Sequence, residues 1–257
     1  SEPVSGAFEV SLTFTETVTG LELSDLSVTN GAASELAGSG ASYTVSITPS
    51  SDGDVSVSLP AGSAQDEAGN DNTVSNTLSI EADLTAPSVA LSSTATEPVS
   101  GAFPLTVTFS EDVTGFELSD LTVGNGVASG LSGSGAVYTA TITPSGDGAV
   151  TVDVASDVAT DAAGNGNTAA TQFSLTNDGT APGVSIATSV SEPVSGSFPI
   201  TVTFTEDVTG FELGDLTVGN GTASELAGSG AVYTATITPA GDGAVTVDIA
   251  ADVAEDA

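Results

Sequence analysis

An internal repeat of 95 residues constrains the fold of this chain more than any other feature. The pentapeptide Glu-Pro-Val-Ser-Gly begins at Glu2 and recurs at Glu97 and Glu192, with 95 residues between successive copies. The same offset relates other residues, among them Phe14, Phe109 and Phe204, and Tyr43, Tyr138 and Tyr233. No insertion or deletion interrupts the alignment. A period of this length is too long for a solenoid unit and matches one small domain.

Within each copy, apolar residues alternate with polar residues at a period of two. In the second copy the alternation runs through 103–109, 138–142 and 150–154. Such alternation places one face of a strand in a core and the other in water. Since no segment has a convincing period of 3.6, the pattern predicts an all-β chain.

Turns rich in Gly, Asn and Asp separate the alternating runs. In the second copy this punctuation predicts seven strands, near 88–91, 103–109, 116–123, 127–131, 137–143, 149–155 and 171–176. Seven short strands in one small domain are typical of an immunoglobulin-like β-sandwich. The sequence therefore predicts tandem seven-stranded immunoglobulin-like β-sandwich domains, arranged as an elongated rod.

The core of such a sandwich has to be filled without cysteine or tryptophan, because the chain contains neither. We expect Phe103, Phe109, Phe116 and Tyr138 to fill it in the second copy, and the equivalent tyrosines to be core residues in the other copies. Pro104 and Pro199 are expected at a sheet edge or at the start of a strand, where no ladder donor is needed.

The repeat phase predicts three domains. Segments that begin at Asp83 and Asp178 and end in Thr-Ala-Pro are predicted linkers, each followed by a first strand. The expected domains are 1–83 without its first strand, 84–178 complete, and 179–257 without its last strand. We interpret the chain as a window on a longer repeat array; the alternative is a strand donated by another chain.

The absence of Lys, Arg, His and Cys excludes whole classes of function. Neither a His-based triad, a thiolate nucleophile nor a zinc site of the usual ligand types can form. With 34 acidic residues and a formal charge of −34, the chain has no cations to displace the counterions of nucleic acid or an anionic membrane surface. No apolar run approaches the ~20 residues of a membrane span. We therefore expect no enzyme, no nucleic-acid partner and no membrane insertion in this segment.

The motifs of the repeat resemble those of a known family. In the second copy they are Thr-Ala-Pro-Ser-Val at 85–89, Glu-Pro-Val-Ser-Gly at 97–101, Phe-Ser-Glu-Asp-Val-Thr-Gly-Phe at 109–116, Tyr-Thr-Ala-Thr-Ile-Thr-Pro at 138–144 and Asp-Ala-Ala-Gly-Asn at 161–165. Across all three copies the chain resembles the bacterial immunoglobulin-like repeats of giant surface adhesins and biofilm-associated proteins. The resemblance implies a bacterial cell-surface or extracellular location, rod-like tandem domains, often calcium at domain junctions, and no catalysis.

The expected topology offers an independent argument for metal at the junctions. Strands of a sandwich alternate in direction, so the loops after the second and sixth strands share a pole with the incoming linker. Oxygen ligands suit calcium. The predicted first site comprises Asp83, Glu111, Asp112, Asp161 and Asn165, with Asp52 and Asp54 facing it; the second comprises Asp178, Glu206, Asp207 and Asp256. The alternative is turn chemistry, in which Asp and Asn only cap their own backbone.

Three functions follow from these expectations. The first is a structural stalk or spacer of a large extracellular surface adhesin, rigidified by calcium, whose partners are the neighbouring repeats of the same chain. The second is a subunit of a self-assembling extracellular filament or sheath, in which other copies are the partners. The third is a glycan-binding module, which the low aromatic content of 5% disfavours.

Overall fold

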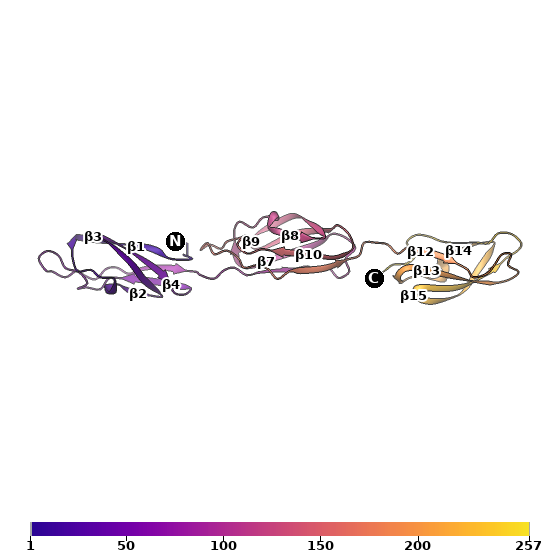
Figure 1. The fold of residues 1–257 in the computed structure, drawn as a ribbon, viewed down its shortest axis with the longest axis horizontal. Helices are drawn as coiled ribbons and strands as arrows, with labels where there is room; N and C mark the ends of the chain where they lie inside the picture. The colour runs from indigo at the N-terminus through magenta and orange to yellow at the C-terminus, as the bar shows by residue number, and fades with distance from the viewer. Residues whose placement is uncertain (1, 257) are drawn as a thin grey trace. The chain divides into compact units, whose positions relative to one another are not determined.

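The computed structural model describes residues 2–256 and is built from strands and short 3-10 turns (Figure 1). The chain divides into two compact units, 1–177 and 178–257. The first unit contains two hydrophobic cores, and the second unit contains one. Each core is enclosed by strands of a single 95-residue copy, so the all-β immunoglobulin-like class predicted from the repeat is confirmed. Among the described residues, no helix has the length and apolar character needed to cross a membrane.

The sandwich formed by the second copy has two three-stranded antiparallel sheets. One has the order β6-β7-β9 and the other β8-β10-β11. The strands are β6 (Val89–Ser92), β7 (Phe103–Val113), β8 (Leu121–Gly124), β9 (Gly126–Pro144), β10 (Gly148–Val154) and β11 (Phe173–Asn177).

Strand β9 contains two of the seven predicted strands, because the chain reverses direction within it. The Ser129 hydroxyl donates to the Thr141 carbonyl over 3.4 Å, a contact that a straight strand could not make across twelve residues. Two glycines at the reversal, Gly133 and Gly135, have φ of 115° and 66°. The predicted strands 127–131 and 137–143 are thus the two arms of one hairpin, and seven strands enclose the core, as expected for an immunoglobulin-like sandwich.

The third predicted strand, 116–123, is partly wrong. The structure has a 3-10 turn η2 (Leu118–Asp120) there, and β8 begins only at Leu121. The Glu117 amide donates to Asp120 Oδ2 over 2.7 Å, and the Asp120 amide donates to the Glu117 carbonyl over 3.1 Å. These local bonds compete with sheet pairing, and alternation of residue types does not reveal them.

Aromatic rings fill the core of the second sandwich as the sequence predicts. Phe103, Phe109, Phe116 and Tyr138 are all buried. The last three meet edge to face, with centroids 5.1–6.0 Å apart, a favourable arrangement for aromatic pairs. The Tyr138 hydroxyl donates to a backbone carbonyl over 3.3 Å, so its polar atom is satisfied inside the core.

The two proline predictions are also confirmed. Pro104 and Pro199 are each the second residue of their strands. Strand β6 pairs with β7 only from Thr106 onward, so the missing amide of Pro104 removes no bond on that side.

The first and third copies form the same sandwich with fewer described strands. In the first, β1 pairs with β3, and β2, β4 and β5 form the second sheet; in the third, β12, β13 and β15 form one sheet and β14 pairs with β16. The first comprises β1 (Phe8–Val18), β2 (Ser27–Thr29), β3 (Gly31–Pro49), β4 (Gly53–Ser58) and β5 (Leu78–Ala82), with turn η1 (Leu23–Asp25). The third comprises β12 (Val184–Ala187), β13 (Phe198–Val208), β14 (Leu216–Gly219), β15 (Gly221–Pro239) and β16 (Thr246–Ile249), with turn η3 (Leu213–Asp215).

Candidate metal centres

The first candidate site brings together three carboxylates that are remote in sequence. Asp83, Glu111 and Asp161 each offer an oxygen, and these oxygens lie within 4.8 Å of one another. The Asp161 side chain is buried, with 6% of its surface exposed. Glu111 and Asp83 are half-buried. Three of the predicted ligands therefore meet at one point.

Two features of the sandwich place Glu111 and Asp161 side by side. The register of β7 against β9 shifts between Thr108 and Val113, and a shift of this kind re-aims side chains at a strand end. Just beyond, the backbones of Thr114 and Thr160 exchange two hydrogen bonds of 2.8 and 2.9 Å. This bridge fixes Asp161, the next residue, beside the end of β7.

Asn165 holds the group together through its amide nitrogen. From Nδ2 it donates to Asp161 Oδ2 and to the Asp83 carbonyl, each over 2.8 Å. Its backbone amide donates to Asp161 Oδ1 over 2.9 Å. The loop can close this tightly because Gly164 has φ of 92°, which glycine adopts without steric cost. Asn165 thus orients the Asp161 carboxylate and ties it to the backbone of Asp83.

Asp52 lies in the turn between β3 and β4, and its carboxylate accepts two hydrogen bonds from the linker. Its Oδ1 accepts from the Leu84 amide over 2.6 Å, and its Oδ2 accepts from the Thr85 hydroxyl over 2.5 Å. These bonds, the Thr85 hydroxyl first, lower the pKa of Asp52 below its usual value. Asp54 faces Glu81 across the β4–β5 ladder, outside the three-carboxylate group.

Asp112 is directed away from its neighbour Glu111. Its carboxylate lies against Gly135, where an added Cβ would come within 2.7 Å of Oδ1. Consecutive residues of a strand point to opposite faces, so Glu111 and Asp112 cannot both join one cluster by simple extension. The same holds in the third copy, where Asp207 lies against Gly230 at the same 2.7 Å.

The electrostatics of the first group favour a bound cation. Burial raises the pKa of Glu111, and the negative charges of Asp83, Asp161 and Asp52 raise it further. Like charges held close together disfavour ionisation of each other. The chain has no Lys, Arg or His to neutralise them.

The second candidate site repeats the arrangement within the unit 178–257. Oxygens of Asp178, Glu206 and Asp256 lie within 4.8 Å of one another, and all three residues are half-buried. The backbones of Thr209 and Glu255 exchange hydrogen bonds of 2.7 and 3.0 Å, which places Asp256 as the Thr114–Thr160 bridge places Asp161. The two groups are equivalent under the 95-residue offset.

The sequence interpretation missed the corresponding loop of the first copy. There Asn70 donates from its amide and its side chain to Asp66, each over 2.8 Å. These bonds, the side-chain one first, lower the pKa of Asp66. Subtracting the repeat offset from Asp161 and Asn165 would have found this pair.

The size of each group fits a calcium ion. Calcium binds oxygen at 2.3–2.6 Å, so ligands on opposite sides of one ion lie about 4.6–5.2 Å apart. Oxygens that all lie within 4.8 Å can therefore contact a single ion. Magnesium binds at 2.0–2.1 Å with strict octahedral geometry and keeps several water ligands, whereas calcium accepts the flexible, all-oxygen coordination that a cluster of carboxylates offers. Metal binding by these residues stays a prediction.

Comparison with known proteins supports the fold assignment. The sequence model of the family described as the bacterial Ig-like domain matches residues 2–82, 83–176 and 178–257. No curated protein matches the sequence.

Two solved structures are similar in parts of their length. A crystal structure of invasin, described as a bacterial integrin-binding protein, is 14% identical with a TM-score of 0.38; the match covers 96% of this chain and 54% of that one. Domains 1–6 of the surface layer protein SbsC are 15% identical with a TM-score of 0.24, over 97% and 52% of the two chains. The chain spans about half the length of each matched structure.

The family matches cover almost the whole chain and repeat in the phase of the internal duplication. The strand order of the second sandwich, with β6-β7-β9 facing β8-β10-β11, is that of an immunoglobulin-like domain once β9 is counted as a hairpin. The chain belongs to the bacterial Ig-like domain family, as a tandem run of three matching segments.

Proposed function

We propose that this chain is a structural spacer of an extracellular bacterial surface protein, and that calcium stiffens it at the linkers. The observation that carries the proposal is the meeting of Asp83, a linker residue, with Glu111 and Asp161 of the sandwich that follows. A cation shared by these three would tie a connecting segment to a folded domain.

The backbone of Asp83 belongs to both sandwiches of the first unit. Its amide donates to the Val4 carbonyl of the first sandwich over 3.0 Å, and its carbonyl accepts from Asn165 of the second over 2.8 Å. A metal on its carboxylate would add a third attachment at the same residue. Reducing the freedom of a hinge in this way is the direct route from metal binding to stiffness.

The composition supports a role in spacing. Three copies that align without gaps provide length, and they contain no Cys, His, Lys or Arg. A net charge of −34 keeps copies apart in solution and attracts divalent cations. Membership of the bacterial Ig-like family supports the extracellular placement.

Calcium titration by calorimetry tests this proposal. We expect two binding events per chain, one for each three-carboxylate group. Asp83→Asn and Asp178→Asn should each remove one event, because each substitution removes a ligand charge while keeping the side-chain shape. Asp54→Asn is the matched control: it lies outside the groups and should leave both events.

Binding must also stabilise the folded chain by mass action, because the unfolded chain has no preformed site. At calcium 100 times above its dissociation constant the gain is about 2.7 kcal/mol. No calcium binding in the calorimeter, or binding that survives both substitutions together, would contradict the proposal.

A further inference from the structure

The outer arm of hairpin β9 is an open sheet edge in the second sandwich. The inner arm 137–142 pairs with β7, and in the described part of the chain no other strand pairs with β9. The outer arm 127–131 therefore presents one row of backbone groups to solvent, although Ala128 and Leu131 pack against the core and hold it in place. An unpaired edge of this kind is a template for pairing with another chain.

The equivalent edges of the other two sandwiches each carry one acidic residue. Under the 95-residue offset Gly130 corresponds to Glu35 and Glu225, and both of these side chains are exposed. Each is the only charged residue of its hairpin, β3 or β15, whereas β9 contains none. A charged side chain on an edge strand opposes pairing with another chain. The edge of the second sandwich lacks this protection.

The backbone at this position has the same geometry in all three sandwiches. Glu35 and Glu225 have φ of 56° and 58°, in the left-handed region that residues with a Cβ adopt only at a steric cost. Gly130 has φ of 65°. A Cβ added at Gly130 would meet open space, so nothing in the second sandwich prevents an acidic side chain there. The three edges therefore differ in charge and not in backbone shape.

Other residues around the second edge also suit contact with a second chain. Val127 is 59% exposed, and the residues at its position in the other copies are the smaller Ala32 and the polar Thr222. Strand β6 contains no acidic residue, and β7 contains acids only at Glu111 and Asp112, close to its end. A sheet extended across this edge would thus place no carboxylate against another along the paired arms.

We propose that the arm 127–131 of the second sandwich pairs with the same arm of a second copy of this chain. When a twofold axis perpendicular to the strands relates them, two identical arms run antiparallel and offer each other the same backbone donors and acceptors. The net charge of −34 repels copies over the rest of the surface, so an uncharged edge is where they can meet. The proposal is independent of the metal sites, because the arm contains none of their residues.

Two features of the edge limit the strength of this pairing. The left-handed residue at position 130 kinks the arm and shortens the ladder that two copies can form. Repulsion between two molecules of this charge also opposes association at low ionic strength. We therefore expect dimers only at high protein concentration. Added salt should increase their number, because it screens the repulsion between exposed charges.

Sedimentation equilibrium of the full chain in high salt, over a wide range of concentrations, tests the proposal. We expect a monomer–dimer equilibrium for the parent chain. Gly130→Glu should weaken it by roughly fivefold or more, because like charges then face each other across the pair. The variant should still fold with only a modest loss of thermal stability, because Glu35 and Glu225 adopt the same backbone geometry.

Glu225→Gly is the converse variant. It removes the acid from the edge of the third sandwich and gives each chain a second unprotected edge. We expect this variant to form assemblies larger than a dimer under the conditions in which the parent chain dimerises. Amide hydrogen exchange of the parent at these concentrations locates the contact: the amides of 127–131 should gain protection, and those of the equivalent arms 32–36 and 222–226 should not.

Four results would overturn the proposal. The parent chain could stay monomeric in high salt up to its solubility limit, or its dimer could be unchanged by Gly130→Glu. Protection could appear on another strand instead of the arm 127–131. Finally, Glu225→Gly could form nothing larger than the parent does, which would show that the acid at this position does not guard the edge.

Discussion

At the scale of single residues, we expect Glu111 to lower the stability of the folded protein without metal and to raise it when calcium is bound. Its pKa is raised by burial and by the charges of Asp83, Asp161 and Asp52. A group with a raised folded-state pKa holds its proton more tightly in the folded state than in the unfolded state. The contribution of Glu111 to the free energy of unfolding therefore falls as the pH rises from 4.5, its usual pKa, through the raised pKa.

Glu111→Gln removes this penalty. In chelator at neutral pH we expect the variant to be more stable than the parent, by up to about 1 kcal/mol, because the pair energies of partly exposed charges are small. With excess calcium the order should reverse, since a charged ligand is lost. Urea unfolding in both conditions measures the change.

Glu16→Gln is the matched control for Glu111→Gln. Glu16 is the repeat equivalent of Glu111, but it is exposed and is not part of a three-carboxylate group. The Glu16→Gln variant should have nearly the stability of the parent, both in chelator and with excess calcium. Equal effects of the two substitutions would contradict the account of a clustered charge.

Asn167 is a second residue whose role the structure defines. It is 1% exposed and satisfies four backbone groups: Oδ1 accepts from the Val158 and Ala159 amides, and Nδ2 donates to the Ala155 and Thr168 carbonyls. All four bonds are 2.8–3.0 Å long. The side chain thus holds the loop that carries Asp161.

Asn167→Ala should destabilise the second sandwich by about 3 kcal/mol, because buried backbone groups are left without partners. Asn72→Ala, at the equivalent position in the first sandwich, should cost less because Asn72 is only half-buried. Hydrogen exchange resolved by sandwich separates the two effects. A larger loss at Asn72 than at Asn167 would contradict this ranking.

At the scale of elements, period-two alternation was sufficient to locate most of the strands. It identified β7, β10 and the two arms of β9 because each has one face in the core. It failed over 116–120, where Asp120 turns the backbone by hydrogen bonding to Glu117. Alternation describes burial, and it carries no information on a side chain that captures its own backbone.

The capping interaction at Asp120 can be tested separately. Asp120→Ala removes the acceptor of the Glu117 amide, and losses of this kind typically cost about 1 kcal/mol. Asp120→Asn keeps an acceptor oxygen and should cost less. Thermal unfolding of the two variants gives the comparison, and equal losses would show that the negative charge, and not the hydrogen bond, matters at this turn.

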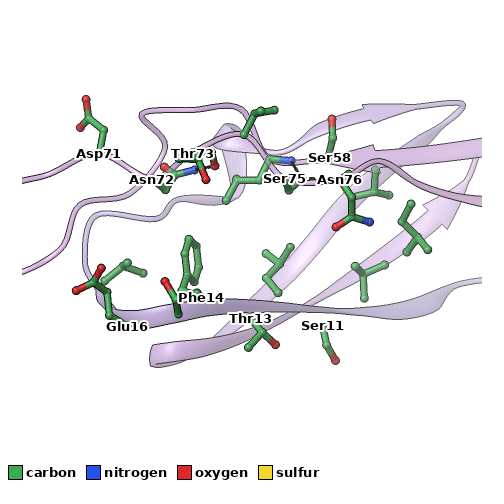
Figure 2. Close-up of a pocket in the computed structure, with 18 of the residues that line it drawn as sticks. Ser11, Thr13, Phe14, Glu16, Ser58, Asp71, Asn72, Thr73, Ser75 and Asn76 are labelled. Atoms are coloured by element: carbon green, nitrogen blue, oxygen red, sulfur yellow. Dashed lines mark hydrogen bonds between the residues drawn. The ribbon is translucent and has the colours of Figure 1, made fainter.

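The candidate site was predictable to the extent that topology determines it. Loops at one pole of a sandwich meet, so Glu111 and Asp161 were expected near Asp83. Asp112 lies outside the three-carboxylate group, because adjacent strand residues face opposite sides, and its role as a ligand stays a prediction. The pocket between β1 and the segment 70–76 of the first sandwich (Figure 2) depends on how the side chains of both segments pack, which alternation along one strand does not describe.

At the scale of the whole molecule, the segments between sandwiches are where a bound metal would act. Linker residues Asp83 and Asp178 each join a carboxylate group of the sandwich that follows. Without metal, mutual repulsion of the acidic residues at each linker is expected to favour a broad range of arrangements. Calcium should narrow that range.

Small-angle X-ray scattering of the full chain tests this claim most directly. We expect excess calcium to give a narrower distribution of interatomic distances with a longer maximum dimension, and a chelator to reverse the change. The double variant Asp83→Asn, Asp178→Asn should not respond. Scattering curves that superimpose with calcium and with chelator would contradict calcium-dependent stiffening of the array.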